Sequence, residues 1–221
     1  MLRVAVLASG RGSNLEALLD ASRAEDSGFA IVGVFSDKPE ALALEIARAA
    51  GIPALALARA KGQDRSQYDA EFFGLVRKVQ PDLIVCAGYM RIISADALAH
   101  LSMPTINIHP SLLPKYPGLH THARALEAGD AEHGSSVHVV TAELDAGPLL
   151  AQARIAVRSG DTPDSLAARV LEYEHRLLPA CVHAIATGRL RLSTTPPQFD
   201  GHPLATPLSL HQNGLRAEVN P

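Results

Sequence analysis

The sequence predicts an α/β fold built on a doubly wound, mostly parallel sheet with an antiparallel C-terminal portion. Apolar runs of strand length alternate with amphipathic helical segments along the first half of the chain. Such alternation is typical of parallel strands joined by right-handed crossovers. After about residue 130 two apolar runs follow one another with no helix between them, so an antiparallel pair is expected there.

Buried apolar runs and boundary residues locate the elements of the first half. Residues 2–8 form a near-continuous apolar run that ends at Ser9-Gly10, as in a strand covered on both faces. A helix over residues 65–79 enters through Asp64, a favourable N-cap. By the same criteria we expect strands at residues 30–35, 54–57, 82–87 and 105–108 and a helix at residues 39–50.

The C-terminal half has a different pattern. Strands are expected at residues 136–140 and 149–157, followed by a long helix over residues 163–187. Pro163 suits a first helical turn and Gly188 suits a helix end. The remainder is rich in Pro, Thr and His. We therefore predict one domain over residues 1–192 and an irregular tail over residues 193–221.

Composition excludes several classes of protein. The chain has 221 residues, of which 47% are hydrophobic and 19% charged, with a net charge of −3. This is ordinary globular composition without the basic excess of a nucleic-acid-binding protein. The first apolar run is too short for a signal peptide or a membrane span, and the two cysteines lack zinc-site spacing. We expect a cytoplasmic protein with no metal and no membrane contact; the sequence carries no signal for an oligomeric state.

The loop Ser9-Gly10-Arg11-Gly12-Ser13-Asn14 joins the first strand to the first helix. Glycines allow a sharp turn and close approach to a ligand, and a helix start offers free N–H groups. The loop therefore suits a phosphate monoester. Leu15 replaces the third glycine of a dinucleotide fingerprint, and no Lys-Ser/Thr pair follows as in a nucleotide P-loop. The alternative interpretation is a glycine turn in which Ser13 or Asn14 caps the helix.

Asn107 and His109 are two residues apart on an extended segment that ends at Pro110. Both side chains should leave the same face of the strand, at the carboxyl end where open α/β sheets bind ligands. An amide donor and an imidazole are suited to stabilise an oxyanion and to move a proton. The alternative is a histidine that only bonds backbone at a turn. Asp130, Glu143 and Asp145 are the candidate carboxylate partners of the histidine.

Six motifs carry a resemblance to a known family: residues 9–14, Gly88-Tyr89-Met90-Arg91-Ile92, the run Asn107 to Gly118, Ser136-Val137-His138, residues 144–148, and Glu174-His175. With these the chain resembles phosphoribosylglycinamide formyltransferases, folate-dependent enzymes of purine synthesis, over about residues 2–192. The run from residue 107 to 118 is the most specific. The resemblance implies a Rossmann-like formyltransferase fold.

The resemblance also implies residue roles. The catalytic group is Asn107, His109 and Asp145, with Asp145 keeping His109 protonated. The phosphoribosyl substrate is held by Gly12, Ser13, Asn14 and Glu174. The folate site comprises Arg65, Met90, Arg91, Ile92, Ile93 and Asn107. His120 and His138 match family histidines near the centre.

The implied reaction is direct transfer of the formyl group of 10-formyltetrahydrofolate, a co-substrate, to the amine of glycinamide ribonucleotide. Two relatives compete with this interpretation. Formyltetrahydrofolate hydrolase normally has an extra N-terminal regulatory domain, and methionyl-tRNA formyltransferase an added C-terminal nucleic-acid-binding domain. The alternative of a different class is a non-catalytic nucleotide-binding regulator. Such a protein would not require Asn107, His109 and Asp145 together.

Overall fold

The computed structural model describes residues 1–217 and divides into two compact units, Met1–Asn107 and Ile108–Pro221. In the first unit five strands pair in the order β3-β2-β1-β4-β5, and every pair is parallel. These strands are β1 (Leu2–Leu7), β2 (Phe29–Ser36), β3 (Ala54–Ala56), β4 (Leu83–Cys86) and β5 (Thr105–His109). The parallel sheet predicted from alternation is thus confirmed.

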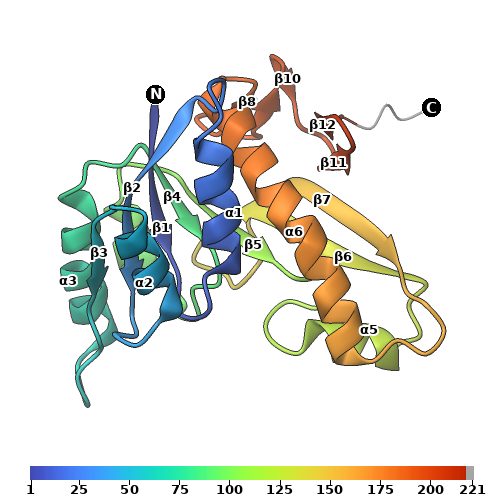
Figure 1. Cartoon of the computed structure of the whole chain (residues 1–221), viewed down its shortest axis with the longest axis horizontal. Helices are drawn as coiled ribbons and strands as arrows, with labels where there is room; N and C mark the ends of the chain where they lie inside the picture. The colour runs from blue at the N-terminus through green and yellow to red at the C-terminus, as the bar shows by residue number, and fades with distance from the viewer. Residues whose placement is uncertain (218–221) are drawn as a thin grey trace. The chain divides into compact units, whose positions relative to one another are not determined.

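Helices connect these parallel strands. They are α1 (Ser13–Ser22), α2 (Leu42–Ala49), α3 (Arg65–Arg77) and the short α4 (Ala95–Ala99). Figure 1 shows α1 and α2 side by side in front of the strands. Residues 83–86 are entirely buried, as expected of a strand covered on both faces. The carboxyl ends of β1 and β4 lead into the glycine loop and the segment 88–93, respectively.

The second unit has an antiparallel pair, β6 (Glu132–Val139) and β7 (Leu149–Ala156), as predicted. The helix α6 (Pro163–Ala186) runs along both strands, and α5 (Thr121–Glu127) packs against it (Figure 1). Thr162 and Ser165 form a reciprocal capping box at the start of α6, and Gly188 follows its end with φ +74°.

The expectation of an irregular tail is wrong for four short segments among the described residues beyond 192. β8 (Leu190–Arg191), β9 (Gln198–Phe199) and β10 (His202–Pro203) form a small antiparallel sheet. β11 (Leu208–His211) pairs in parallel with β7, and β12 (Gly214–Arg216) pairs antiparallel with β11. Main-chain pairing in strands this short needs no hydrophobic alternation, so these strands have no recognisable sequence pattern. Residues 218–221 of the expected tail lie outside the described residues, and the domain boundary at residue 192 stays a prediction.

Other differences concern element boundaries. The helix expected from residue 39 begins at Leu42, because Pro39 and Glu40 form a turn. The strand expected from residue 136 begins at Glu132 and includes buried His133, Ser135 and Ser136. The helices α4 and α5 were not predicted, since segments of five and seven residues are too short to show helical periodicity. No helix of the described residues is long and apolar enough to cross a membrane.

Candidate active site

The glycine loop lies between β1 and α1 in a conformation that requires glycine. Gly12 has φ +82°, and a Cβ at this position would lie 2.8 Å from the Cα of Ala43. Gly12 is also the N-cap of α1, with no side-chain capping bond to the helix. The N-cap therefore supplies no side-chain acceptor to the first turn of this ten-residue helix, and a helix start is where backbone N–H groups point outward. This is the arrangement that favours an anion.

Ser9 links the glycine loop to two other strand ends of the first unit. Its hydroxyl donates to Asp37 Oδ1 over 2.5 Å and accepts from the Met90 backbone N–H over 2.9 Å. Its own N–H donates to the Gly88 carbonyl oxygen over 3.0 Å. The ends of β1, β2 and β4 are thereby tied together. The sequence motif included Ser9, but Asp37 lay outside every motif.

The segment after β4 combines exposed apolar side chains with a fixed guanidinium. Met90 is 64% exposed and Ile92 50% exposed, whereas Ile93 is buried. The Arg91 guanidinium carbon lies 4.5 Å from the centre of the Tyr68 ring. Exposed apolar side chains next to a guanidinium held against an aromatic ring suit a flat, partly apolar ligand with acidic groups.

Arg65 is the first residue of α3, directly after the N-cap Asp64. The Asp64 side chain accepts from the N–H groups of Ser66 and Gln67, as predicted for a helix entry. Within residues 1–217 the Nε atoms of Arg65 and Arg91 are buried without a hydrogen-bond partner. Such atoms are uncommon, and a ligand could satisfy them.

β5 carries Asn107 and His109 two residues apart, so strand geometry sends both side chains to one face. Asn107 pairs with Cys86 of β4 in the parallel register. His109 is 5% exposed, and its Nε2 donates to the Tyr116 carbonyl oxygen over 2.9 Å. Because this carbonyl can only accept, Nε2 carries a hydrogen, which leaves Nδ1 as the ring nitrogen for other partners.

Of the three candidate carboxylates, Asp145 is the partner of His109. Asp145 Oδ2 lies 3.4 Å from His109 Nδ1, and Oδ1 lies 3.6 Å from His138 Nε2. The Gly118 N–H donates to Oδ2 over 2.8 Å. Glu143 is exposed, and Asp130 pairs with Lys115 instead. Asp145 adopts φ +52° in the turn before β7, a conformation in which a non-glycine residue is uncommon.

Burial and charge oppose one another in this cluster. Burial lowers the pKa of His109, although the hydrogen bond to Tyr116 and the charge of Asp145 raise it in part. The expectation that Asp145 keeps His109 protonated near neutral pH is therefore corrected, because desolvation outweighs the carboxylate. Burial tends to raise the pKa of Asp145, but its hydrogen bonds to His138 and Gly118 and the nearby imidazoles bring the pKa below its usual value. The cluster thus holds an ionised carboxylate next to a mostly neutral imidazole.

Three further histidines take up different positions in the second unit. His120 is exposed at the N-cap of α5, whereas His122 lies against His133 with 3.1 Å between Nδ1 and Nε2. Burial, with the charge of His122 second, lowers the pKa of His133 to about 4. Sequence reasoning missed His133, which belongs to no motif.

The predicted ribotide ligand Glu174 lies on α6 and is 7% exposed. Within the described part of the chain no group of three or more His, Cys, Asp or Glu side chains is arranged so that it could hold a metal ion.

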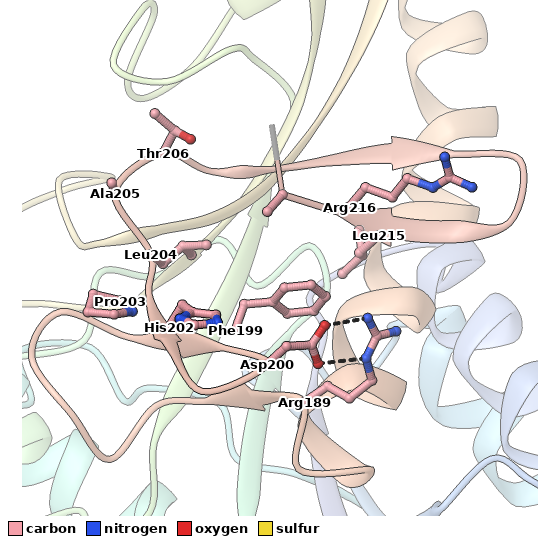
Figure 2. A pocket seen from close by; sticks show the side chains of 11 residues that line it. Arg189, Phe199, Asp200, His202, Pro203, Leu204, Ala205, Thr206, Leu215 and Arg216 are labelled. Carbon is pink, nitrogen blue, oxygen red and sulfur yellow. Dashed lines mark hydrogen bonds and ion pairs between the residues drawn. The ribbon is translucent and has the colours of Figure 1, made fainter. Parts of the chain in front are cut away.

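A pocket of about 420 Å³ lies at the C-terminal sheet of the second unit (Figure 2). Figure 2 shows the lining residues Arg189 and Asp200 paired through two hydrogen bonds, which are 2.9 and 2.7 Å long. Phe199 and Leu215 supply apolar surface. None of the predicted site residues lines this pocket.

Comparison with known proteins identifies the family of the chain. Residues 2–182 match the formyl transferase family, and the chain belongs to that family. It is 45% identical to the phosphoribosylglycinamide formyltransferase of Escherichia coli (strain K12), over 92% of this chain and 96% of that protein. The enzyme of the same name from Haemophilus influenzae is 38% identical over 92% of this chain and 96% of that protein.

A solved structure extends this agreement to the fold. The phosphoribosylglycinamide formyltransferase of Coxiella burnetii, in complex with CHES, has a TM-score of 0.87 and 42% identity, and covers 92% of this chain and 96% of that one. The Rossmann-like formyltransferase fold is thereby confirmed. These relatives support formyl transfer in purine biosynthesis and give no support to the hydrolase or the regulator. The family implies a folate-derived formyl donor and small-molecule substrates.

Proposed function

We propose that this protein transfers the formyl group of 10-formyltetrahydrofolate to the amine of glycinamide ribonucleotide. The main support for this proposal is a buried cluster in a chain of the formyl transferase family. In this cluster Asp145 lies 3.4 Å from His109 and 3.6 Å from His138. The names of the relatives support the choice of the ribotide as acceptor. We expect a cytoplasmic enzyme whose partners are small molecules, with neither nucleic acid nor a membrane involved.

The ribotide phosphate is assigned to the start of α1. Gly12 allows close approach, and Ser13 and Asn14 present the first N–H groups of the helix together with their side chains. The helix dipole adds attraction for a dianion at this end. Glu174, a buried carboxylate on α6, is assigned to a polar group of the ribotide.

The folate is assigned to Arg65, the segment Met90 to Ile93 and Asn107. Met90 and Ile92 offer apolar surface, while the buried Ile93 contributes through backbone groups. Arg91, held against the Tyr68 ring, and Arg65 provide positive charge for the carboxylates of the donor. The unpaired buried Nε atoms of both arginines fit an acidic ligand.

In the proposed reaction the ribotide amine attacks the formyl carbon, a C–N bond forms, and the bond from this carbon to N10 of the folate breaks. The Asn107 amide donates to the developing oxyanion. His109 acts in proton transfer through Nδ1, because Nε2 already donates a hydrogen bond to the Tyr116 carbonyl. The developing negative charge favours the imidazolium form of His109, and the ionised Asp145 stabilises it. The proton lost by the amine ends on N10, and no covalent enzyme intermediate forms.

One assay tests this proposal and separates it from the alternatives. The protein is mixed with 10-formyltetrahydrofolate, with and without glycinamide ribonucleotide, and loss of the formyl donor is followed. Loss only in the presence of the ribotide supports the transferase. Loss with water alone would instead support a hydrolase, and no loss under either condition would favour a binding protein.

A further inference from the structure

The turn Lys115–Gly118 contacts both acid–base partners of the second unit. The Tyr116 carbonyl accepts from His109 Nε2 over 2.9 Å, and the Gly118 N–H donates to Asp145 Oδ2 over 2.8 Å. The first contact determines which imidazole nitrogen carries hydrogen, and the second orients the carboxylate. The two contacts come from backbone groups two residues apart, so both depend on the conformation of this short turn.

This conformation is unfavourable on its own. Tyr116 has φ +56°, a left-handed conformation that is strained for a bulky side chain. Such a residue keeps its conformation only when its surroundings hold it there. The structure must therefore contain contacts that fix the turn.

Asp130 supplies the principal contacts. The Tyr116 hydroxyl donates to Asp130 Oδ2 over 2.9 Å, and Lys115 Nζ donates to both carboxylate oxygens over 2.9 Å. The Asp130 side chain is 16% exposed, whereas that of Lys115 is 59% exposed. One carboxylate thus binds two consecutive residues of the turn. Arg124 adds a bond of 2.7 Å to the Pro117 carbonyl and lies 5.2 Å from the Tyr116 ring centre.

We propose that Asp130 is a positioning residue for the formyl-transfer reaction: through Tyr116 it fixes the Nε2–H tautomer of His109 and directs Nδ1 toward Asp145. The inference rests on the proposed function for its catalytic part. Asp130 bonds to Lys115 and Tyr116, which belong to the turn. Its effect passes through the Tyr116 carbonyl, whose direction changes if the strained turn relaxes.

The test uses two variants that leave every backbone group of the turn in place. Tyr116→Phe removes only the hydroxyl that Asp130 accepts from, and Asp130→Asn removes the charge. A matched control is Asp200→Asn, which also removes a carboxylate from an ion pair, with Arg189 at 2.7 Å in the C-terminal sheet. The ring nitrogens of ¹⁵N-histidine-labelled protein are observed by NMR, and His109 is assigned by its absence in His109→Asn.

We expect wild-type His109 to be a single Nε2–H tautomer and both turn variants to be tautomer mixtures. Their kcat should fall by about 10-fold, because a small misplacement of a reacting group is costly, while KM for the ribotide stays within about 3-fold. The double variant should lose less kcat than the product of the two single losses, because both changes act on the Tyr116–Asp130 contact. Asp200→Asn should change neither the tautomer nor kcat.

Several results would overturn the inference. An unaltered His109 tautomer in both variants, a wild-type Nδ1–H tautomer, or an equal effect of Asp200→Asn would each contradict the positioning role. Altered tautomers with unchanged kcat would contradict its catalytic part. If the wild-type protein fails to consume 10-formyltetrahydrofolate, the proposed function is wrong, but the NMR result still decides whether Asp130 sets the His109 tautomer.

Discussion

Asp145→Asn removes the negative charge next to His109 and nearly preserves shape. Asp145 Oδ2 lies 3.4 Å from His109 Nδ1, and both side chains are less than 10% exposed. At this separation two unit charges interact by about 1–5 kcal/mol for effective dielectric constants of about 80 to 20, which corresponds to roughly 1–4 pKa units. A fall of about 1–3 units in the His109 pKa is therefore expected.

The measurement is an NMR titration of His109 in the wild type and in Asp145→Asn, combined with the pH dependence of kcat. The limb of the kcat profile that follows His109 should move to lower pH by the same amount as the pKa. The Asn side-chain oxygen can still accept from the Gly118 N–H, so the turn is retained. Asp200→Asn serves as the control. An unchanged or raised His109 pKa in Asp145→Asn would refute the reasoning, and Asp145 would be a turn residue only.

Protonation of His109 and Asp145 also changes the stability of the folded protein. Because the folded pKa of His109 is lowered, the unfolded chain binds the proton more readily, and stability falls as the pH drops below the unfolded value of about 6.5. The lowered pKa of Asp145 has a separate effect: its contribution to stability is present above the unfolded pKa and is lost as the pH falls through the folded pKa. The stability advantage of the wild type over Asp145→Asn should therefore be largest above about pH 4 and shrink as the pH falls below it.

Four further predictions follow. Asn14→Asp should raise KM for the ribotide more than KM for the folate, because the lost bond to a phosphate is worth roughly 1.5–3 kcal/mol and repulsion adds to it; equal changes in both KM values would contradict the placement. Asn107→Ala should lower kcat by about 10²–10³ with little change in binding, and near wild-type kcat would remove Asn107 from the mechanism. Gly12→Ala should lower the free energy of unfolding in urea by at least about 1–2 kcal/mol, because of the positive φ and the 2.8 Å approach to Ala43; an unaltered midpoint would show that the loop adapts. The His133 pKa of about 4 should cost at most about 3 kcal/mol of stability between pH 7 and pH 4, and urea unfolding of His133→Asn should lose this dependence if the histidine causes it.

The pairing of an amide with an imidazole at a strand end could be predicted locally from the sequence, whereas formyl transfer was implied only by the resemblance to a known family. Asn107 and His109 share a face of β5 because strand side chains alternate, and a two-residue spacing is visible without coordinates. The glycine loop was likewise recognisable from its place between an apolar run and a helical pattern. The alternation of strands and helices predicted the parallel sheet, because burial on both faces leaves a continuous apolar run.

Tertiary structure decided what depends on distance between remote segments. Apart from the family resemblance, the sequence did not distinguish Asp130, Glu143 and Asp145. Folding brings Asp145 to 3.4 Å from His109, whereas Asp130 pairs with Lys115. The His109 pKa also depends on burial, which no local pattern measures, and the expected protonated imidazole was therefore wrong. The short strands after residue 192 form by main-chain pairing, which leaves no signature in side-chain periodicity.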